Sequence, residues 1–262
     1  MPPLRLMAVL AHPDDESFGI GGTLAKYASE GVDVFLLTAT RGDRGRYRDY
    51  RFGDPQHPGS PALAAIRERE LRAAAAALGV QDVALLDYRD QELDRANPPQ
   101  IIAAIVEHLR RVHPHVVITF GPDGAYGHPD HIAISQLATG AVVAAADPAI
   151  SKLYYIAWPA STWAAYQSAF KKLTSTVDGV ERQVVPWPDW EITTVIDTRP
   201  FTQKVWQAII CHESQMGIYT QLAQLSPEHR DAVWGEQSFY RVFSTVNGGR
   251  AREADLFEGI RQ

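Results

Sequence analysis

The sequence predicts an α/β fold: a doubly wound, mostly parallel, Rossmann-like sheet with helices on both faces, followed by a C-terminal elaboration. Through the first 150 residues, short apolar runs alternate with longer stretches of helical character. The runs are apolar throughout, as in parallel strands that are buried on both faces. Each intervening stretch is long enough for the crossover that joins two parallel strands, which favours a doubly wound sheet.

The expected elements follow one another in regular order. Strands are predicted at Leu4–Ala11, Val32–Thr40, Val83–Asp87, His115–Phe120, Leu153–Trp158 and Thr194–Asp197. Helices are predicted at Gly22–Ser29, Ala62–Leu78, Pro99–Val112, Pro129–Ala146 and Phe201–Gln215. We expect one domain over residues 1–262, in which a core (1–150) carries the functional site and an elaboration (151–262) can act as a substrate lid.

The composition narrows the classes of function. Lys and Arg number 25 and Asp and Glu 31, which gives a net charge of −6. Nucleic-acid-binding proteins usually carry a basic excess, so no nucleic-acid partner is expected. The single cysteine, Cys211, cannot form an intrachain disulfide or a cysteine-based zinc cluster.

The same features favour a cytoplasmic location. The apolar run after Arg5 is too short for the core of a signal peptide, and no stretch approaches the length of a membrane span. We therefore expect a cytoplasmic protein without stable membrane insertion. The sequence leaves the oligomeric state open, and a homo-oligomer is compatible with it.

A first polar cluster, from His12 to Glu16, directly follows the first predicted strand. One interpretation is a plain turn, in which Asp14 and Asp15 cap a helix that begins near Ser17 and Glu16 is an acid in its first turn. The functional interpretation divides the work between adjacent carboxylates. One binds a metal together with His12, and the other faces the water bound to that metal. Ligands of open α/β sheets bind beyond the carboxyl ends of the strands, where this cluster lies.

A second cluster, Tyr126 to His131, follows the fourth predicted strand. Pro129 suits the first position of a helix, which places His128 at the cap and His131 on the first turn. Two histidines three residues apart, with Asp130 between them, stand at the end of another strand. Both clusters are therefore expected at the same edge of the sheet.

Together the two clusters offer two histidines, one carboxylate and open coordination positions, which is the pattern of a catalytic zinc site. Zinc activates a bound water, and a second carboxylate can take its proton as it attacks a carbonyl carbon. These residue types therefore indicate metal-assisted amide or ester hydrolysis. The facial triad of non-haem Fe(II) oxygenases uses the same ligand types, but the extra acid beside the ligand favours hydrolysis. The ligands would also accept Fe(II) or Co(II).

The motifs Ala-His-Pro-Asp-Asp-Glu (residues 11–16) and Gly-His-Pro-Asp-His (residues 127–131) resemble the signatures of the LmbE-like, or PIG-L, zinc-dependent N-deacetylases. That family removes acetyl groups from N-acetylglucosaminyl compounds on a Rossmann-like fold. The resemblance covers residues 4–145 well, including Arg67 and Glu70. It continues thinly through His212, Ser214 and Gln215.

The resemblance implies a set of roles. His12, Asp15 and His131 would be the zinc ligands. Asp14 would be the general base that activates water.

The resemblance also implies roles for neighbouring residues. His128 would be the acid or the oxyanion partner, with Asp130 orienting its ring. Tyr126 would reach the carbonyl oxygen, and Arg67 would contact sugar hydroxyls. Family members often have Gly-Glu after the second strand, where this chain has Gly42 and Asp43, so a sugar contact by Asp43 would start from a shorter side chain.

Five arginines lie between Arg41 and Arg51. One interpretation is a solvated loop of mixed charge. The other is recognition of an anionic group on the substrate by arginine forks, with Arg44 as a candidate.

The leading interpretation is a zinc hydrolase that deacetylates a small amino-sugar, an N-acetylglucosamine conjugate. Two alternatives stay open: an amidase acting on a bulkier sugar or thiol conjugate in the same site, and a non-catalytic metal or sugar binder. The presence of Asp14 beside the ligands argues against the binder, because binding alone needs no base.

Overall fold

The structure is a computed structural model that describes residues 3–169, 174–177, 179–217, 222, 224–249 and 251–261. Its centre is a seven-stranded sheet of order β3-β2-β1-β4-β5-β9-β8. The first five strands of this order run parallel: β1 (Arg5–Leu10), β2 (Asp33–Thr40), β3 (Asp82–Tyr88), β4 (Val116–Phe120) and β5 (Lys152–Ile156). The sheet is completed by β9 (Glu236–Ser244), antiparallel to β5, and β8 (Thr194–Asp197), antiparallel to β9.

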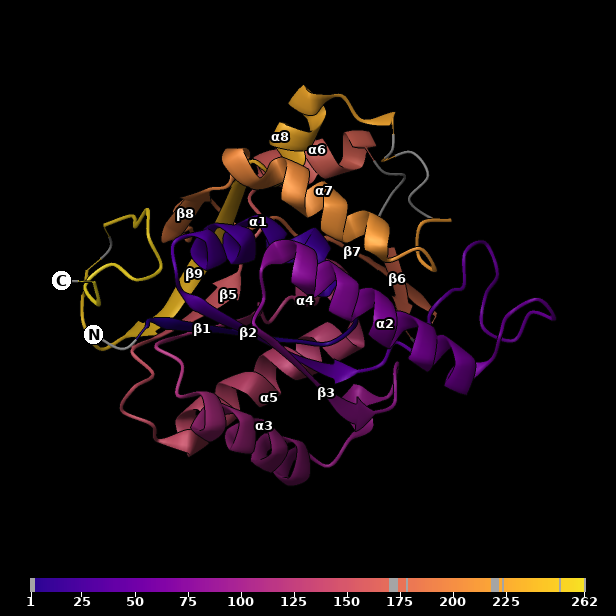
Figure 1. Ribbon diagram of the computed structural model, residues 1–262, viewed down its shortest axis with the longest axis horizontal. Helices are drawn as coiled ribbons and strands as arrows, with labels where there is room; N and C mark the ends of the chain where they lie inside the picture. The colour runs from indigo at the N-terminus through magenta and orange to yellow at the C-terminus, as the bar shows by residue number, and fades with distance from the viewer. Residues whose placement is uncertain are drawn as a thin grey trace.

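Helices cover both faces of the sheet (Figure 1). One face carries α1 (Asp15–Ser29), α2 (Ser60–Leu78) and α7 (Thr202–Cys211), and the other carries α3 (Pro98–Val112) and α5 (Pro129–Ala145). The central strands β1 and β4 are buried along almost their whole length, because each is covered from both sides. The predicted doubly wound α/β fold is confirmed.

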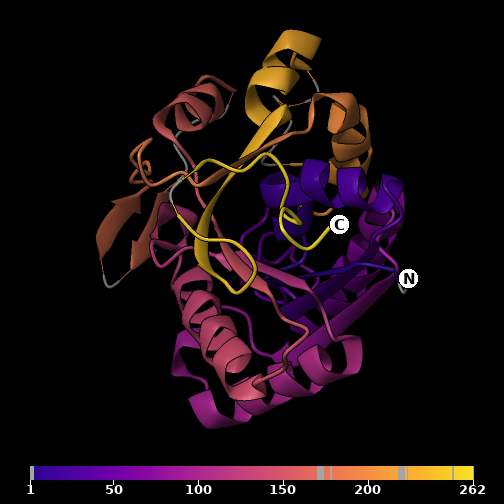
Figure 2. The same ribbon diagram turned by 90° about the vertical axis from the view of Figure 1, so that its left-hand side faces the viewer.

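The C-terminal part adds α6 (Ala160–Ala169), α8 (Pro227–Trp234) and a hairpin of β6 (Thr174–Val177) and β7 (Val180–Gln183). Figure 2 shows α6 and α8 on the same side of the sheet as α7, opposite α3 and α5. These helices share a second apolar cluster, in which Trp163, Val233 and Trp234 pack against Val205 and Ile209 of α7. Short helical turns occur at α4 (Gly124–Gly127), η1 (Leu93–Arg95) and η2 (Arg199–Phe201).

Several elements differ from the sequence prediction. Helix α1 begins at Asp15 rather than Gly22, because its first two turns are largely buried and tertiary packing stabilises them despite the glycines at 19, 21 and 22. A Cβ atom at Gly22 would stand only 2.5 Å from Cβ of Thr198, so this glycine lets the segment before η2 approach the helix. Helix α7 ends at Cys211, four residues early, because the next residue turns into the interior. The sequence analysis does not predict strands β6, β7 and β9 or helices α6 and α8.

The topology fixes where a ligand can bind. Strands β1, β3 and β4 end at one edge of the sheet, and the segments that follow them lie side by side there.

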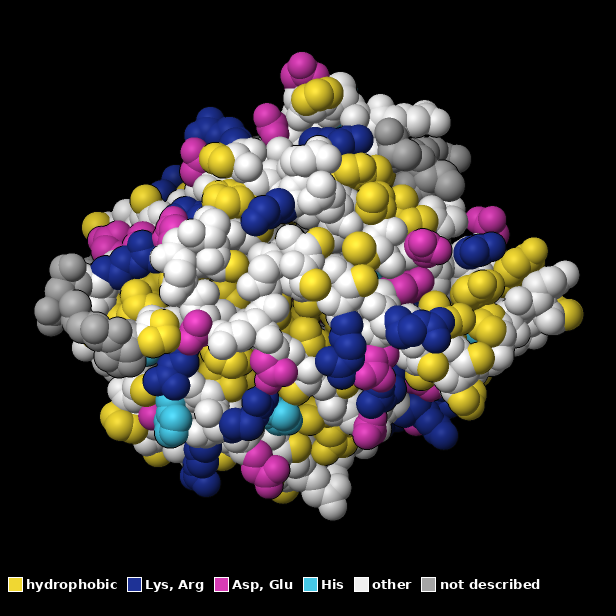
Figure 3. Space-filling view, in the orientation of Figure 1, with side chains coloured by type: hydrophobic (Ala, Val, Ile, Leu, Met, Phe, Trp, Pro, Cys, Tyr) yellow, Lys and Arg dark blue, Asp and Glu magenta, His cyan; other side chains and the backbone are white. Residues whose placement is uncertain are grey.

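No described helix is both long and apolar enough to cross a membrane. On the face shown in Figure 3, acidic and basic side chains are interspersed.

Candidate active site and metal centre

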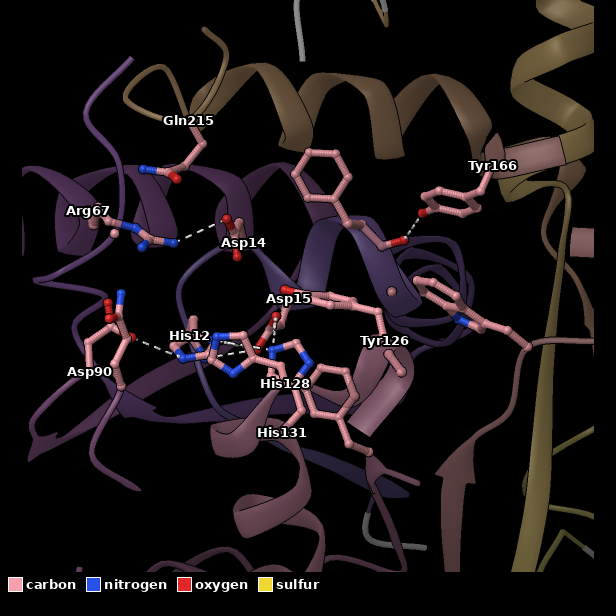
Figure 4. A pocket seen from close by; sticks show the side chains of 17 residues that line it. His12, Asp14, Asp15, Arg67, Asp90, Tyr126, His128, His131, Tyr166 and Gln215 are labelled. Atoms are coloured by element: carbon pink, nitrogen blue, oxygen red, sulfur yellow. Dashed lines mark hydrogen bonds and ion pairs between the residues drawn. The ribbon is translucent and has the colours of Figure 1, made fainter. Parts of the chain in front are cut away.

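The three predicted metal ligands meet at this edge of the sheet (Figure 4). His12 lies in the turn after β1, Asp15 in the first turn of α1 and His131 in the first turn of α5. His12 Nδ1 is 3.1 Å from His131 Nε2, Asp15 Oδ1 is 3.3 Å from His131 Nε2, and Asp15 Oδ2 is 3.7 Å from His12 Nδ1.

These distances fit a metal ion. Ligand atoms around a tetrahedral zinc ion, each about 2.0–2.1 Å from it, stand about 3.3 Å from one another. The three side chains are buried, and two of them present ring nitrogens to the same point. Without an ion, the nearest polar partners that the described residues offer these two imidazole nitrogens are each other and the Asp15 carboxylate.

Two further carboxylates orient His12. Its Nε2 lies 3.0 Å from Asp130 Oδ2 and 3.2 Å from Asp90 Oδ1. An ionised carboxylate can only accept, so Nε2 carries the proton and Nδ1 is left with a lone pair toward the other ligands. Burial acts to lower the pKa of His12, but the hydrogen bonds to Asp130 and Asp90 raise the pKa well above its usual value. The cluster of carboxylates thus favours a positive charge at this point.

The role expected for Asp130 needs correction. Its fully buried carboxylate contacts His12 and accepts the backbone N–H groups of Gln91 at 2.7 Å and Leu93 at 3.0 Å, and it makes no hydrogen bond to the His128 ring. Instead, the backbone N–H of Asp130 donates to His128 Nδ1 at 3.2 Å. The carboxylate therefore supports His12, a predicted metal ligand, and Asp130 orients His128 only through its main chain.

His128 is the helix cap of α5, as the sequence predicts. Burial lowers the pKa of its ring to about 3, so the ring is neutral. Because Nδ1 accepts a hydrogen bond, the proton resides on Nε2, which makes that nitrogen a donor. Beside it, the His131 ring stacks on Phe120 with centroids 4.0 Å apart and planes 9° apart, which fixes the direction of the ligand.

Asp14 stands next to the ligands in a conformation that is unusual for its residue type, with φ of 109°. Burial raises the pKa of its carboxyl to about 6, and the nearby Asp15 adds to the rise, whereas Arg67 opposes it. Such a pKa suits a group that accepts a proton near neutral pH.

The plain-turn interpretation is only partly right: Asp14 occupies the cap position, and Asp15 and Glu16 stand in the first turn of α1. The side chain of Asp14, however, makes no capping hydrogen bond. The carboxylate of Asp15 instead accepts the backbone N–H groups of Ala11 and His12, at 3.2 and 2.8 Å. The end of β1 thus holds the Asp15 side chain against the predicted ligands.

Arg67 reaches the site from α2 and is almost fully buried. Its Nη2 donates to Asp14 Oδ2 at 3.1 Å and to the carbonyl of Pro13, and its Nη1 donates to the carbonyl of Gly42 at 3.0 Å. Gly42 has φ of 60°, and a Cβ atom there would overlap the guanidinium group. Arg67 lines the cavity, and two of these hydrogen bonds hold the turn that carries Asp14.

The structure does not place Asp43 and Arg44 on the wall of the cavity. The Asp43 carboxylate accepts the hydroxyl of Ser60 and the backbone N–H of Asp90, the latter at 3.2 Å. The Arg44 guanidinium pairs with Glu92 at 2.6 Å. Both side chains thus brace the loops behind the site, in place of the substrate contacts predicted for them.

The cavity in front of the ligands has a volume of about 220 Å³. Sequence reasoning missed two kinds of lining residue. Asp90 and Gln91 follow β3, so the rule that directed attention to the ends of β1 and β4 would also have found them. Tyr166 and Gln215 come from the C-terminal part, where Gln215 belongs to the thin continuation of the family resemblance and no motif marks Tyr166.

The cavity has a polar and an aromatic side. Asp14, Arg67 and Gln215 form part of the polar side (Figure 4). On the other side Trp158 stacks on Tyr166, with ring centroids 4.9 Å apart. Tyr126, predicted as a catalytic residue, lies on the wall with its ring centroid 5.5 Å from that of His131.

Comparison with known proteins places this site in a wider context. A curated relative, "1D-myo-inositol 2-acetamido-2-deoxy-alpha-D-glucopyranoside deacetylase" of Kineococcus radiotolerans, is 34% identical over 98% of this chain and 83% of its own length. Among solved structures, the N,N'-diacetylchitobiose deacetylase of Pyrococcus horikoshii matches with a TM-score of 0.66 at 21% identity, over 92% of this chain and 84% of that one.

The fold also occurs in another kind of enzyme. The 4-carboxy-2-hydroxymuconate hydratase GalB of Pseudomonas putida KT2440 matches with a TM-score of 0.69 at 18% identity, over 95% of this chain and 100% of that one. Fold likeness alone therefore does not select a reaction. The sequence profile of the family described as "PIG-L: GlcNAc-PI de-N-acetylase" matches residues 7–142. With this match and the relative above, the chain belongs to the PIG-L family.

Proposed function

We propose that this protein is a metal-dependent hydrolase that removes the acetyl group from an N-acetylglucosamine conjugate. The proposal rests on one observation: the Asp14 carboxyl group lies beside the three predicted metal ligands, His12, Asp15 and His131. Burial raises the pKa of this carboxyl group. A purely structural metal site needs no such group. The relatives named as deacetylases of an N-acetylglucosaminyl inositol support the same reaction.

We assign the residues as follows. His12, Asp15 and His131 would hold the ion, and we propose Zn²⁺, although the same ligands accept Fe²⁺. When bound, a divalent ion supplies Lewis-acid chemistry that activates water and polarises an amide carbonyl. Asp14 takes the proton from the attacking water.

The wall of the cavity supplies the remaining groups. The His128 Nε2–H is a donor for the negative charge that develops on the carbonyl oxygen. Arg67 fixes the direction of the Asp14 carboxylate and opposes its protonation. A contact of Tyr126 with the substrate carbonyl stays a prediction, as does a role of the C-terminal part as a lid.

The cavity favours a substrate without a negative charge. Among the described residues that line it, Arg67 is the only lysine or arginine, and its guanidinium is bonded to Asp14 and two carbonyls. Asp14, Asp15 and Asp90 give the wall an acidic character. In the loop after β2, Arg41 pairs with Glu68 and Asp87, and Arg44 pairs with Glu92. This arrangement supports a neutral polyol as the conjugated group, rather than a phosphate or a carboxylate.

Acetate release from matched conjugates tests this function. We expect the zinc-loaded protein to release acetate from N-acetylglucosaminyl inositol and to act poorly on a phosphorylated analogue. Asp14→Asn should keep the metal and lose about 10²- to 10⁴-fold in kcat, because it removes the proton acceptor. Preference for the phosphorylated substrate would contradict the proposed specificity, and full activity of Asp14→Asn would exclude it as the base. If the protein released no acetate but hydrolysed bulkier amides, this result would favour the amidase alternative.

The support that Asp130 gives to His12 can be tested through metal affinity. We expect Asp130→Asn to weaken zinc binding about 10- to 100-fold, because the amide cannot hold the Nε2–H as an ionised carboxylate does. Competition with a chromogenic chelator measures the affinity. Asp147→Asn is the matched control, since Asp147 also bonds a histidine, His113, but away from the site. Equal affinity of Asp130→Asn and the control would show that the contact is irrelevant to the metal.

The pH dependence should report on Asp14. The base acts only when deprotonated, so kcat/KM is expected to fall as the pH drops through the pKa of its carboxyl. Burial raises this pKa to about 6 even though the Arg67 charge already lowers it, and a bound cation would lower it further, so the acid limb of the wild-type profile should lie below about pH 6. Arg67→Met removes one of the two lowering charges and should move the limb to higher pH, whereas Arg67→Lys should move it less. If the acid limb of Arg67→Met lay at the same pH as that of the wild type, the claim that Arg67 lowers the pKa of Asp14 would be refuted.

A further inference from the structure

We propose that Glu16 and His212 form a buried positioning pair that sets the direction of the Asp14 carboxylate. The inference rests on the proposed function, because it concerns the residue assigned there as the base. Neither residue lines the cavity, and neither makes a hydrogen bond to the three predicted metal ligands. They act on Asp14 through its main chain.

The contacts form a short relay between two distant parts of the chain. Glu16 Oε2 accepts the backbone N–H of Asp14 at 3.0 Å. Glu16 Oε1 accepts the hydroxyl of Ser17 at 2.5 Å and lies 2.7 Å from His212 Nε2. Because an ionised carboxylate only accepts, Nε2 of His212 carries the proton and donates it. The carboxylate of Glu16 is thus held at both oxygens.

The location of the pair argues for a specific role. Glu16 and His212 are both 0% exposed, although one stands in the first turn of α1 and the other directly follows α7. An ionic pair with no contact to water is weak support for stability, since apolar residues of the same volume often replace it without loss. A buried pair of this kind therefore needs another explanation, and its third partner provides one.

That third partner is the Asp14 backbone in its left-handed conformation. A non-glycine residue holds such a φ only where its surroundings determine it. Glu16 fixes the N–H of Asp14, and Arg67 fixes its carboxylate and the carbonyl of Pro13. The turn is therefore held from both sides, from α2 by Arg67 and from α7 by His212 through Glu16. Loss of the Glu16 contact leaves the carboxylate free to swing relative to the attacking water.

The test separates positioning from stability. In Glu16→Gln, one amide oxygen must serve donors that the carboxylate met with two oxygens, and we expect kcat to fall about 10- to 100-fold with KM almost unchanged. In the double variant Glu16→Met/His212→Leu, apolar side chains replace the pair, and we expect a melting temperature near that of the wild type but a larger loss of kcat. Zinc stoichiometry should stay the same in both.

A matched control and a second background complete the design. Glu253→Gln removes a buried carboxylate that pairs with Lys152 at 2.7 Å in another part of the fold, and it should lower stability without lowering kcat. In an Asp14→Asn background, the Glu16 variants should cost nothing further, because a group that acts through Asp14 has no effect once the base is gone. The amide proton of Asp14, observed by NMR, should shift upfield in Glu16→Met/His212→Leu.

The outcomes are distinct. Wild-type kcat in both Glu16 variants, or an equal loss with and without the Asp14 carboxylate, would overturn the positioning role. An unmoved Asp14 amide signal would overturn the hydrogen bond itself. If the wild-type protein released no acetate from any conjugate, the proposed function would fail, while the amide signal would still decide whether Glu16 holds the turn.

Discussion

The site depends on one contact, in which the imidazole of His12 lies against the carboxylates of Asp130 and Asp90. His12 follows β1, Asp90 follows β3 and Asp130 opens α5 after β4. This contact therefore joins the segments that follow three strands. It also decides which ring nitrogen faces the other predicted ligands, because the carboxylates take the proton on Nε2. The parallel sheet makes the contact available, since its strands end at a common edge.

The electrostatics of the site follow from that arrangement. Asp14, Asp15, Asp90 and Asp130 are gathered where water is largely excluded, and buried negative charge is costly unless a cation compensates it. Arg67 compensates Asp14, and a metal ion would compensate the rest. The same crowding raises the pKa of Asp14 while Asp15 stays ionised, so two adjacent carboxyls acquire different properties.

Much of the candidate site could be predicted from the sequence, because its main residues lie in two short motifs next to predicted strands. His12 and Asp15 lie in the segment directly after β1, and His131 lies in the first turn of the helix that follows β4, so strand prediction alone brings them to one edge of the sheet. The direction of the Asp130 carboxylate could not be predicted, because it depends on the backbone N–H groups of Gln91 and Leu93.

The other features that the sequence did not predict also depend on tertiary contacts. The strand-end rule points to the segment after β3, but Asp90 stands there among other charged residues, and only its tertiary contact with His12 distinguishes it from them. Glu16 and His212 are separated by 196 positions, and their pairing depends on how α7 packs beside α1. Strand β9 joins the sheet antiparallel to β5, which the α/β alternation of the first half does not foreshadow. The cytoplasmic location and a homo-oligomeric state stay predictions.

The central claim is that His12 turns Nδ1, not Nε2, toward the ion. A crystal structure of the zinc-loaded protein with anomalous diffraction at the zinc edge tests it directly. We expect one peak, about 2.0–2.2 Å from His12 Nδ1, a carboxylate oxygen of Asp15 and His131 Nε2. The structure also contains a rival group of donors, formed by His12, Asp90 and Asp130. A peak among those three residues would contradict the account, because the carboxylates that we assign to orienting His12 would then be the ligands.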